Sequence, residues 1–160
     1  MIHNVKGNLL ESNCDYICHQ VNCQGVMDSG IARQIREKWP EVYDAYKGWY
    51  EACSADSPDG HAYRYMMGNY LIVPISMDKN IINMASQNRC GYDGLRYTSY
   101  DAFELCLQHI KDSIPKKCSI GFPKGIGCGL GGGDWKIVSA LIWAVLGEKF
   151  EVYIYEWNGE

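Results

Sequence analysis

The densest chemical signal in the chain is a run of glycines between residues 123 and 135. This run reads PKGIGCGLGGGDW, with six glycines within nine residues, and it follows an apolar stretch. Glycine permits positive φ and allows a backbone to approach a ligand closely. Consecutive N–H groups in such a turn, with a helix N-terminus behind them, form a binding site for anions. The run therefore predicts a loop that binds a phosphate or a diphosphate.

Three established phosphate chemistries can be compared with this run. A Walker A loop needs Gly-x-x-x-x-Gly-Lys-Ser/Thr, and no such string occurs in the chain. A cysteine-dependent phosphatase places an arginine six residues after its cysteine, whereas Asp134 stands at that distance from Cys128. Residues 127–132 match the Gly-x-Gly-x-x-Gly pattern of nicotinamide enzymes, but too few elements follow for that fold. A redox dinucleotide protein stays a minor alternative.

A second polar loop, HQVNCQGVMDSGIA at residues 19–32, also lies between an expected strand and an expected helix. Asn22 can both donate and accept hydrogen bonds, which suits a sugar hydroxyl. Ser29 is the expected N-cap, and Gly30 would let the helix N-terminus approach a phosphate. His19 could act as a general base or as a cation beside a phosphate, or it could be a hydrogen-bonded core histidine.

The pattern of apolar residues predicts alternating strands and helices. Strands are expected at 1–6, 16–21, 69–75, 80–86, 118–122 and 150–155, and helices at 29–39, 40–53, 98–112 and 134–146. Residues 54–68 and 88–96 are expected to be loops, and Asp134 an N-cap. This order predicts an α/β domain of three layers, whose mainly parallel sheet binds ligands at the carboxyl ends of its strands.

Composition excludes several classes of protein. The chain of 160 residues fits one domain, and its net charge of −4 with scattered Lys and Arg argues against non-specific nucleic-acid binding. No apolar run reaches the length of a membrane span, and residues 1–7 lack a signal-peptide pattern. The eight cysteines form no Cys-x-x-Cys pair, so we expect reduced thiols in a cytoplasmic protein without membrane partner, metal or cofactor.

In these motifs and in their order, the sequence resembles the macrodomains, which bind ADP-ribose. Four segments account for the resemblance: residues 5–8, 19–32, 125–134 and 152–155. It implies a single α/β/α macrodomain over residues 1–160, with a mixed, mainly parallel sheet of about six strands. Within the family, the sequence looks most like the branch that contains ADP-ribose 1″-phosphate phosphatases.

The resemblance also implies roles for individual residues. Asn8 and Tyr155 would lie beside adenine, Asn22 beside the distal ribose, and residues 29–32 and 127–132 around the diphosphate. Catalysis would fall to His19 and Asn22. The full set of ligand contacts that it implies is Asn8, Leu9, Gln20, Asn22, Val26, Ser29, Gly30, Ile31, Ala32, Gly127, Cys128, Gly129, Leu130, Gly131, Gly132 and Tyr155.

Some residues depart from the family pattern. Asn8 replaces an aspartate and Asp28 a glycine, while Gln87 and Gly131 stand where related glutamate-linkage hydrolases have a lysine and an aspartate. The favoured hypothesis is hydrolysis of a substituent at the anomeric carbon of the distal ribose, with a 1″-phosphate as the leading case. The partner would be ADP-ribose, a derivative, or an ADP-ribosylated macromolecule. A non-catalytic ADP-ribose-binding module and an interaction domain with vestigial loops are alternatives.

Overall fold

The computed structural model describes residues 1–157, and its centre is one sheet of six strands. In chain order these are β1 (Ile2–Lys6), β2 (Tyr16–Val21), β3 (Tyr70–Pro74), β4 (Asn80–Ala85), β5 (Ser119–Pro123) and β6 (Glu151–Glu156). Their order in the sheet is β1-β6-β5-β2-β4-β3, and every pair is parallel except β3 with β4. The expected mixed, mainly parallel sheet is confirmed.

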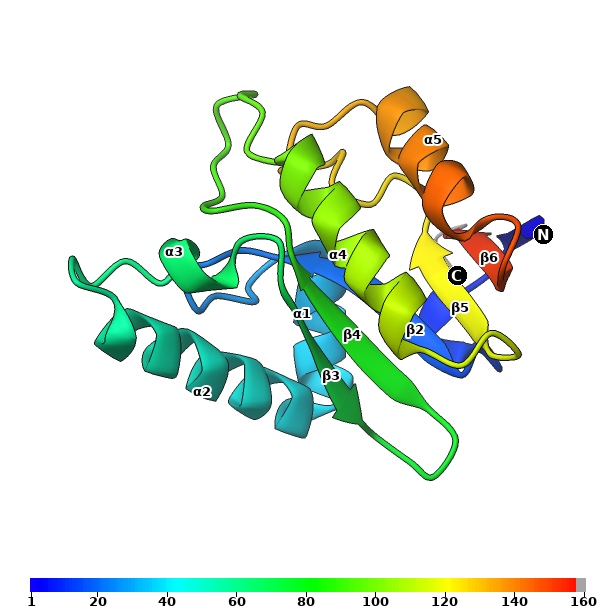
Figure 1. The fold of residues 1–160 in the computed structure, drawn as a ribbon, viewed down its shortest axis with the longest axis horizontal. Coiled ribbons are helices and arrows are strands. Elements are labelled where there is room, and N and C mark those ends of the chain that lie inside the picture. The colour runs from blue at the N-terminus through cyan, green and yellow to red at the C-terminus, as the bar shows by residue number, and fades with distance from the viewer. Residues whose placement is uncertain (158–160) are drawn as a thin grey trace.

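Helices cover both faces of the sheet (Figure 1). They are η1 (Leu9–Glu11), α1 (Gly30–Lys38), α2 (Pro40–Asp56), α3 (Tyr63–Met66), α4 (Tyr100–Ser113) and α5 (Trp135–Leu146). One apolar core lies under α4 and α5, and a second lies between the opposite face and α1 and α2. These are the three layers that the alternation of elements predicts.

Side-chain capping explains where two of the helices, α4 and α5, begin. The Ser99 side chain accepts a hydrogen bond from Ala102 N at 3.1 Å, and the Asp134 side chain accepts one from Lys136 N at 2.9 Å. Asp134 is thus an N-cap, as expected. Ser29 stands at the N-cap position of α1 in extended backbone, but its side chain makes no capping hydrogen bond. The first N–H groups of α1 are therefore left without that partner.

The segment 54–68 is more helical than its polar composition suggests. Helix α2 continues to Asp56, and α3 adds a single turn at Tyr63–Met66. Ser54, Ala55 and Asp56 tolerate a helix, and the helix ends where Ser57 precedes Pro58 in extended backbone (φ −74°, ψ 134°). A residue before proline is pushed out of the helical region, which explains the position of the break.

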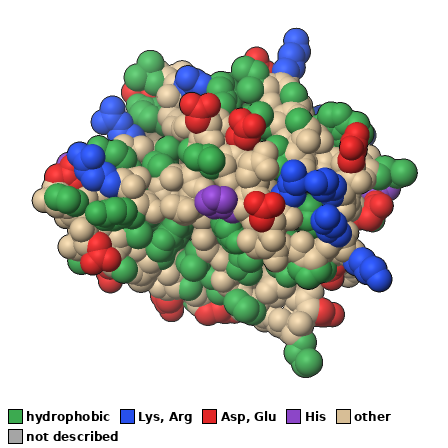
Figure 2. Space-filling model, viewed as in Figure 1, with side chains coloured by type: hydrophobic (Ala, Val, Ile, Leu, Met, Phe, Trp, Pro, Cys, Tyr) green, Lys and Arg blue, Asp and Glu red, His purple; other side chains and the backbone are tan. Residues whose placement is uncertain are grey.

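The thiols and surface charges agree with the composition. All eight cysteines are free, and burial raises the pKa of Cys23 and of Cys106 to about 12, so these two behave as apolar thiols. Figure 2 shows Lys and Arg interspersed with Asp and Glu on the face that it draws. Within residues 1–157, no helix combines the length and apolar character needed to cross a membrane.

His19 lies in the core rather than at the surface, which differs from the expectation of a catalytic residue. It has no exposed surface, and its Nε2 lies 2.6 Å from Asn83 Oδ1 on the neighbouring strand β4. Because that oxygen only accepts, Nε2 donates the proton. Burial lowers the pKa of His19 to about 4, so the ring is neutral at pH 7. The ring therefore links β2 to β4 through Nε2, while its buried Nδ1 has no hydrogen-bond partner within residues 1–157.

We predict a pH-dependent stability that originates at His19. An unfolded histidine has a pKa near 6.5, whereas the folded ring has a pKa of about 4, so the unfolded chain binds more protons between these values. The free energy of unfolding should therefore fall by roughly 3 kcal/mol as the pH is lowered through this window. Urea unfolding at several pH values should show this slope and a shallower one in His19→Gln. Parallel profiles for the two proteins would contradict the assignment.

Candidate functional site

A cavity of about 500 Å³ opens at the carboxyl edge of the sheet, where β2, β4 and β5 end. Two loops form its opposite walls: residues 20–32, which run from β2 into α1, and residues 123–131, which follow β5. Parallel strands end at one edge, so loops far apart in sequence meet there. Of the residues expected to contact a ligand, the lining contains Gln20, Asn22, Val26, Ser29, Gly30, Ile31, Ala32, Gly127, Gly129, Leu130 and Gly131.

The N-terminus of α1 forms one wall of the cavity. The first hydrogen bond of this helix runs from Arg33 N to Ser29 O at 3.3 Å. The N–H groups of residues 30–32 come before it and have no carbonyl of the helix to bind. Gly30 has a φ of +58°, a conformation that glycine adopts without strain. This wall therefore offers backbone N–H donors and the positive end of the helix dipole.

The glycine loop forms the opposite wall and has a defined conformation. Gly133 N donates to Gly127 O at 2.9 Å, and Gly132 N donates to Gly129 O at 3.0 Å. Gly127 and Gly132 both have positive φ, at 75° and 70°. The N–H groups of residues 129–131 are not used in these bonds. The loop can therefore present donors to an anion in the cavity, which is the arrangement that a diphosphate requires.

A polar network centred on Gln20 ties the glycine loop to the strands. The Gln20 amide nitrogen donates to Gln87 Oε1 at 2.5 Å and to Thr98 Oγ1 at 2.9 Å, and Ser86 Oγ donates to Gln20 Oε1 at 2.6 Å. Thr98 Oγ1 in turn donates to Gly127 O at 2.7 Å, and Thr98 N to Gly131 O at 2.9 Å. The ends of β2 and β4 thereby fix the wall that faces the ligand.

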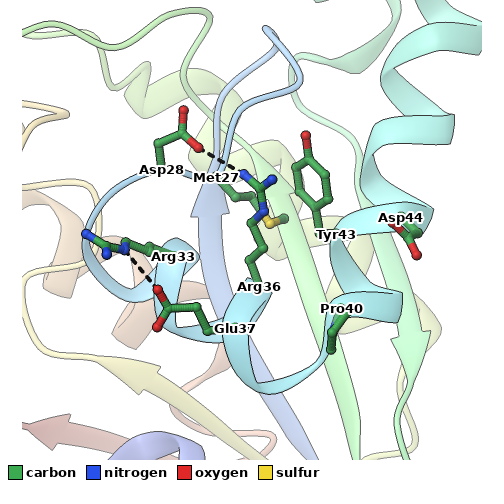
Figure 3. A pocket seen from close by; sticks show the side chains of 8 residues that line it. All are labelled: Met27, Asp28, Arg33, Arg36, Glu37, Pro40, Tyr43 and Asp44. Atoms are coloured by element: carbon green, nitrogen blue, oxygen red, sulfur yellow. Dashed lines mark hydrogen bonds and ion pairs between the residues drawn. The ribbon is translucent and has the colours of Figure 1, made fainter.

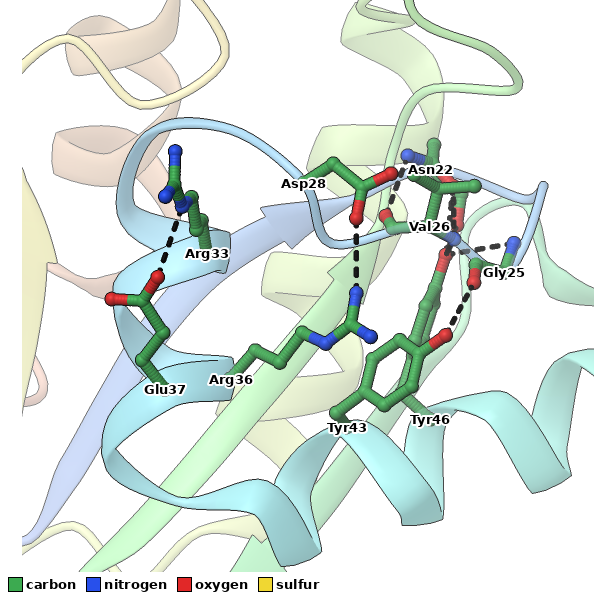
Figure 4. Close-up of polar contacts among 9 residues, drawn as sticks. All are labelled: Asn22, Gly25, Val26, Asp28, Arg33, Arg36, Glu37, Tyr43 and Tyr46. Carbon is green, nitrogen blue, oxygen red and sulfur yellow. Dashed lines mark hydrogen bonds and ion pairs between the residues drawn. The ribbon is translucent and has the colours of Figure 1, made fainter.

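The first loop is held from behind by Tyr46 (Figure 4). The hydroxyl of this fully buried residue shares its one proton between the Asn22 backbone and side-chain oxygens, at 2.8 and 2.7 Å, and accepts from the N–H groups of Gly25 and Val26. Asn22 Nδ2 donates to Val26 O at 2.9 Å. The amide of Asn22 thus shapes the loop, and its second N–H stays free for a ligand.

Asp28 is turned toward α1 rather than left unpaired in the cavity. Its Oδ1 lies 2.9 Å from Arg36 Nη1, and the guanidinium stacks 3.9 Å above the centre of the Tyr43 ring. Figure 3 shows these side chains around a second, larger hollow of about 670 Å³, outside the loop. There Arg33 is paired with Glu37 as well, so both arginines already have partners. We therefore place the ligand site in the cavity between the two loops.

Several residues expected at the site do not line the cavity. His19 is buried in the sheet, and Cys128 Sγ instead lies 3.4 Å from Ile126 O with its pKa raised by burial, which keeps it a thiol. Asn8 caps η1 through Leu10 N, and Leu9 and Tyr155 belong to the core beside α1. Gly132 donates a hydrogen bond to Gly129 O within the loop and does not line the cavity. The expected adenine contacts therefore lie beyond the cavity wall.

The lining also contains residues that the ligand-contact set omits. They are Val21, Met27, Asp28, Gln87, Cys90, Tyr92, Pro123, Lys124, Gly125 and Ile126. The loop after β4 supplies Gln87, Cys90 and Tyr92. The sequence could have indicated these residues, because β4 is parallel to β2 and the loop that follows it must lie at the same edge of the sheet.

The two departures at Gln87 and Gly131 have structural consequences. Gln87 is nearly buried, and its amide is used between Gln20 and the Arg89 carbonyl. A Cβ at Gly131 would meet Gly127 O at 2.7 Å, so this position has no room for an aspartate. A lysine–aspartate mechanism is thus absent from these positions. Among residues 1–157, no cluster of three or more His, Cys, Asp or Glu side chains could hold a metal ion.

Comparison with known proteins identifies relatives of the chain. No protein-family model matches it. It is 28% identical over 159 residues to a DNA ADP-ribosyl glycohydrolase from Thermus aquaticus, covering 98% of this chain and 41% of that protein. It is 35% identical over 80 residues to an ADP-ribose 1″-phosphate phosphatase from Scheffersomyces stipitis, covering 46% of this chain and 43% of that protein. The matches thus span about two fifths of these relatives' lengths.

A solved structure establishes the fold. The macrodomain of Thermus aquaticus DarG superposes with a TM-score of 0.75, at 24% identity, over 99% of this chain and 98% of that one. The sheet, its covering helices and the cleft at its carboxyl edge therefore form a macrodomain fold. The sequence relationship to the Thermus aquaticus glycohydrolase extends along almost the whole chain.

We predict that Gly131→Ala distorts the glycine loop and that Gly129→Ala does not. A Cβ at 131 would collide with Gly127 O and the Thr98 side chain, whereas a Cβ at 129 has no neighbour within 4 Å. Overpacking of this kind costs about 1–3 kcal/mol. Urea unfolding should show that loss for Gly131→Ala and less than about 0.5 kcal/mol for Gly129→Ala. Equal stabilities would contradict the close approach at residue 131.

Proposed function

We propose that this protein binds ADP-ribose in the cavity between the two loops and hydrolyses a substituent at the anomeric carbon of its distal ribose. The observation that supports this most is the pair of backbone N–H arrays, at the start of α1 and in residues 129–131, on opposite walls of one cavity. A diphosphate has oxygens on both sides and needs donors on both sides. The two relatives are named for activities on ADP-ribose derivatives, which supports the same ligand.

The positions of the two cavity walls indicate where each part of the nucleotide would lie. The diphosphate would lie between residues 30–32 and the glycine loop. The distal ribose would lie toward Asn22 and Gln87, at the ends of β2 and β4. Adenine would lie at the end of the cavity formed by Pro123 and Lys124, next to Tyr155, which does not itself line the cavity. Adenine, diphosphate and distal ribose would thus follow one another across the sheet in the direction β6, β5, β2, β4.

The leading substrate is ADP-ribose 1″-phosphate, with water replacing the phosphate on the distal ribose. Because His19 has no exposed surface, we propose that the group that orients water comes from the lining of the cavity. Among the described residues of the lining, Asp28 supplies the one carboxylate, and Arg36 holds it in place. The same burial of His19 favours a second candidate function, a module that binds ADP-ribose without turnover.

Phosphorus NMR and calorimetry test this proposal. We expect calorimetry to detect heat when ADP-ribose binds, and ADP-ribose to compete with ADP-ribose 1″-phosphate for the site. In the phosphorus spectrum, the signal of the phosphate monoester should convert to that of inorganic phosphate. Line broadening of the nucleotide signals without conversion would support the binding module instead. Absence of binding by ADP-ribose at millimolar concentration would contradict the proposed function as a whole.

Asp28→Asn should tighten ADP-ribose binding, because it removes a negative charge from the wall of an anion site. We expect the dissociation constant to fall about three- to tenfold at low salt, with a smaller effect at high salt. Asp44→Asn is the matched control, since Asp44 lines the outer hollow and not the ligand cavity. If Asp28 also orients water, the variant loses turnover while it gains affinity. Equal changes in both variants would contradict a local effect.

A further inference from the structure

Helix α5 carries an apolar face that no part of the described chain covers. The helix lies beside α4 on the outside of the sheet (Figure 1), and its sequence, WKIVSALIWAVL, contains a single charged residue. The residues exposed on its outer side are Lys136, Ile137, Ala140, Trp143 and Ala144, which we call the α5 face. Ile137 is 42% exposed and Trp143 is 54% exposed.

The outer sides of the neighbouring helices are more polar. Helix α2 exposes Glu41 and Glu51, and on α4 the exposed Leu105 is accompanied by the exposed acids Asp101 and Glu104. A helix at the surface of a single domain normally turns charged and polar residues to water. Exposed apolar patches with tryptophan are typical of surfaces that bind another protein chain. The α5 face is therefore a candidate interface.

Two opposite charges flank this face at equal distances from its centre. Lys136 lies six positions before Ile142, and Glu148 lies six positions after it, and both charged residues are exposed. Gly147 keeps helical backbone (φ −59°, ψ −31°), so Glu148 continues the stripe that contains Ala144, four residues earlier. Within residues 1–157, neither Lys136 nor Glu148 forms an ion pair.

We propose that the α5 face binds the α5 face of a second copy of this chain, in an antiparallel pair about a two-fold axis at the level of Ile142. A two-fold axis brings the same patch of both copies together, so the patch must be complementary to itself. In this pair, Lys136 of each copy lies level with Glu148 of the other. Ala140 lies level with Ala144, where small side chains let the helices approach closely.

Charge complementarity is the reason to choose a second copy in this orientation. A parallel pair would set Lys136 against Lys136 and Glu148 against Glu148, which is unfavourable. A contact confined to one helix and its flanks is smaller than the roughly 800 Å² per partner of a standard interface, so the dimer should exchange with the monomer at micromolar concentrations. The ligand cavity stays open, because its lining contains no residue of α5.

Sedimentation velocity from micromolar to millimolar protein concentration tests the dimer. The sedimentation coefficient of the wild type should rise with concentration toward that of a dimer. Ala140→Glu places a charge at the centre of the α5 face and should stay monomeric. Ala52→Glu is the matched control, because Ala52 is an exposed alanine on α2, and this variant should dimerise like the wild type. Urea unfolding should show that both variants are folded.

Charge reversal tests the antiparallel arrangement. Lys136→Glu and Glu148→Lys should each raise the dissociation constant of the dimer about tenfold at low salt, because each variant sets two pairs of like charges against each other. An equimolar mixture of the two variants should recover dimers of wild-type affinity, since a mixed dimer restores both pairs of opposite charges.

Three outcomes would overturn the proposal. A wild type that stays monomeric at millimolar concentration would show that the α5 face does not bind a second copy. A dimer that persists in Ala140→Glu would place the interface elsewhere on the molecule. Failure of the mixture to recover dimers would contradict the pairing of Lys136 with Glu148.

Discussion

The hydrogen bonds of Gln20 are the interaction on which the site depends. Its amide joins the ends of β2 and β4, through Gln87 and Ser86, to Thr98, and Thr98 holds the carbonyls of Gly127 and Gly131. A glycine-rich loop has many accessible conformations, and ordering it costs more entropy than ordering other residues. Binding an anion to a disordered loop would have to offset that cost. The Gln20 network, which is fixed to the sheet, orders the loop before the ligand binds, so ligand binding does not have to offset this entropy cost.

This arrangement would allow a chain with a net charge of −4 to bind an anionic nucleotide, as we propose. The attraction is local, since it comes from backbone N–H groups at the start of α1 and in the glycine loop. The acidic side chain nearest to the cavity, Asp28, is neutralised by Arg36, which Tyr43 holds in place by stacking. Charge on the rest of the surface therefore has little influence on the site, because salt screens it over such distances.

The sequence allowed the fold and both loops to be predicted because these depend on local signals. Alternating apolar segments determine the strands and helices, and glycine density between a strand and a helix indicates an anion loop. The position of His19 could not be predicted, since its side chain lies on a strand whose two faces are both covered. The pairing of Asp28 with Arg36 and the use of Gln87 in the network depend on contacts between distant segments, which no local pattern encodes. Helix α2 extends farther than its polar end suggests because proline, rather than polarity, determines where it stops.

We expect the two loops to bind one nucleotide between them. Proton–nitrogen correlation NMR during a titration with ADP-ribose tests it most directly, because it reports on the backbone N–H groups themselves. The amides of residues 30–32 and 129–131 should shift together and saturate at one ligand concentration. Shifts confined to the outer hollow around Arg33 and Arg36, or in one loop without the other, would contradict it.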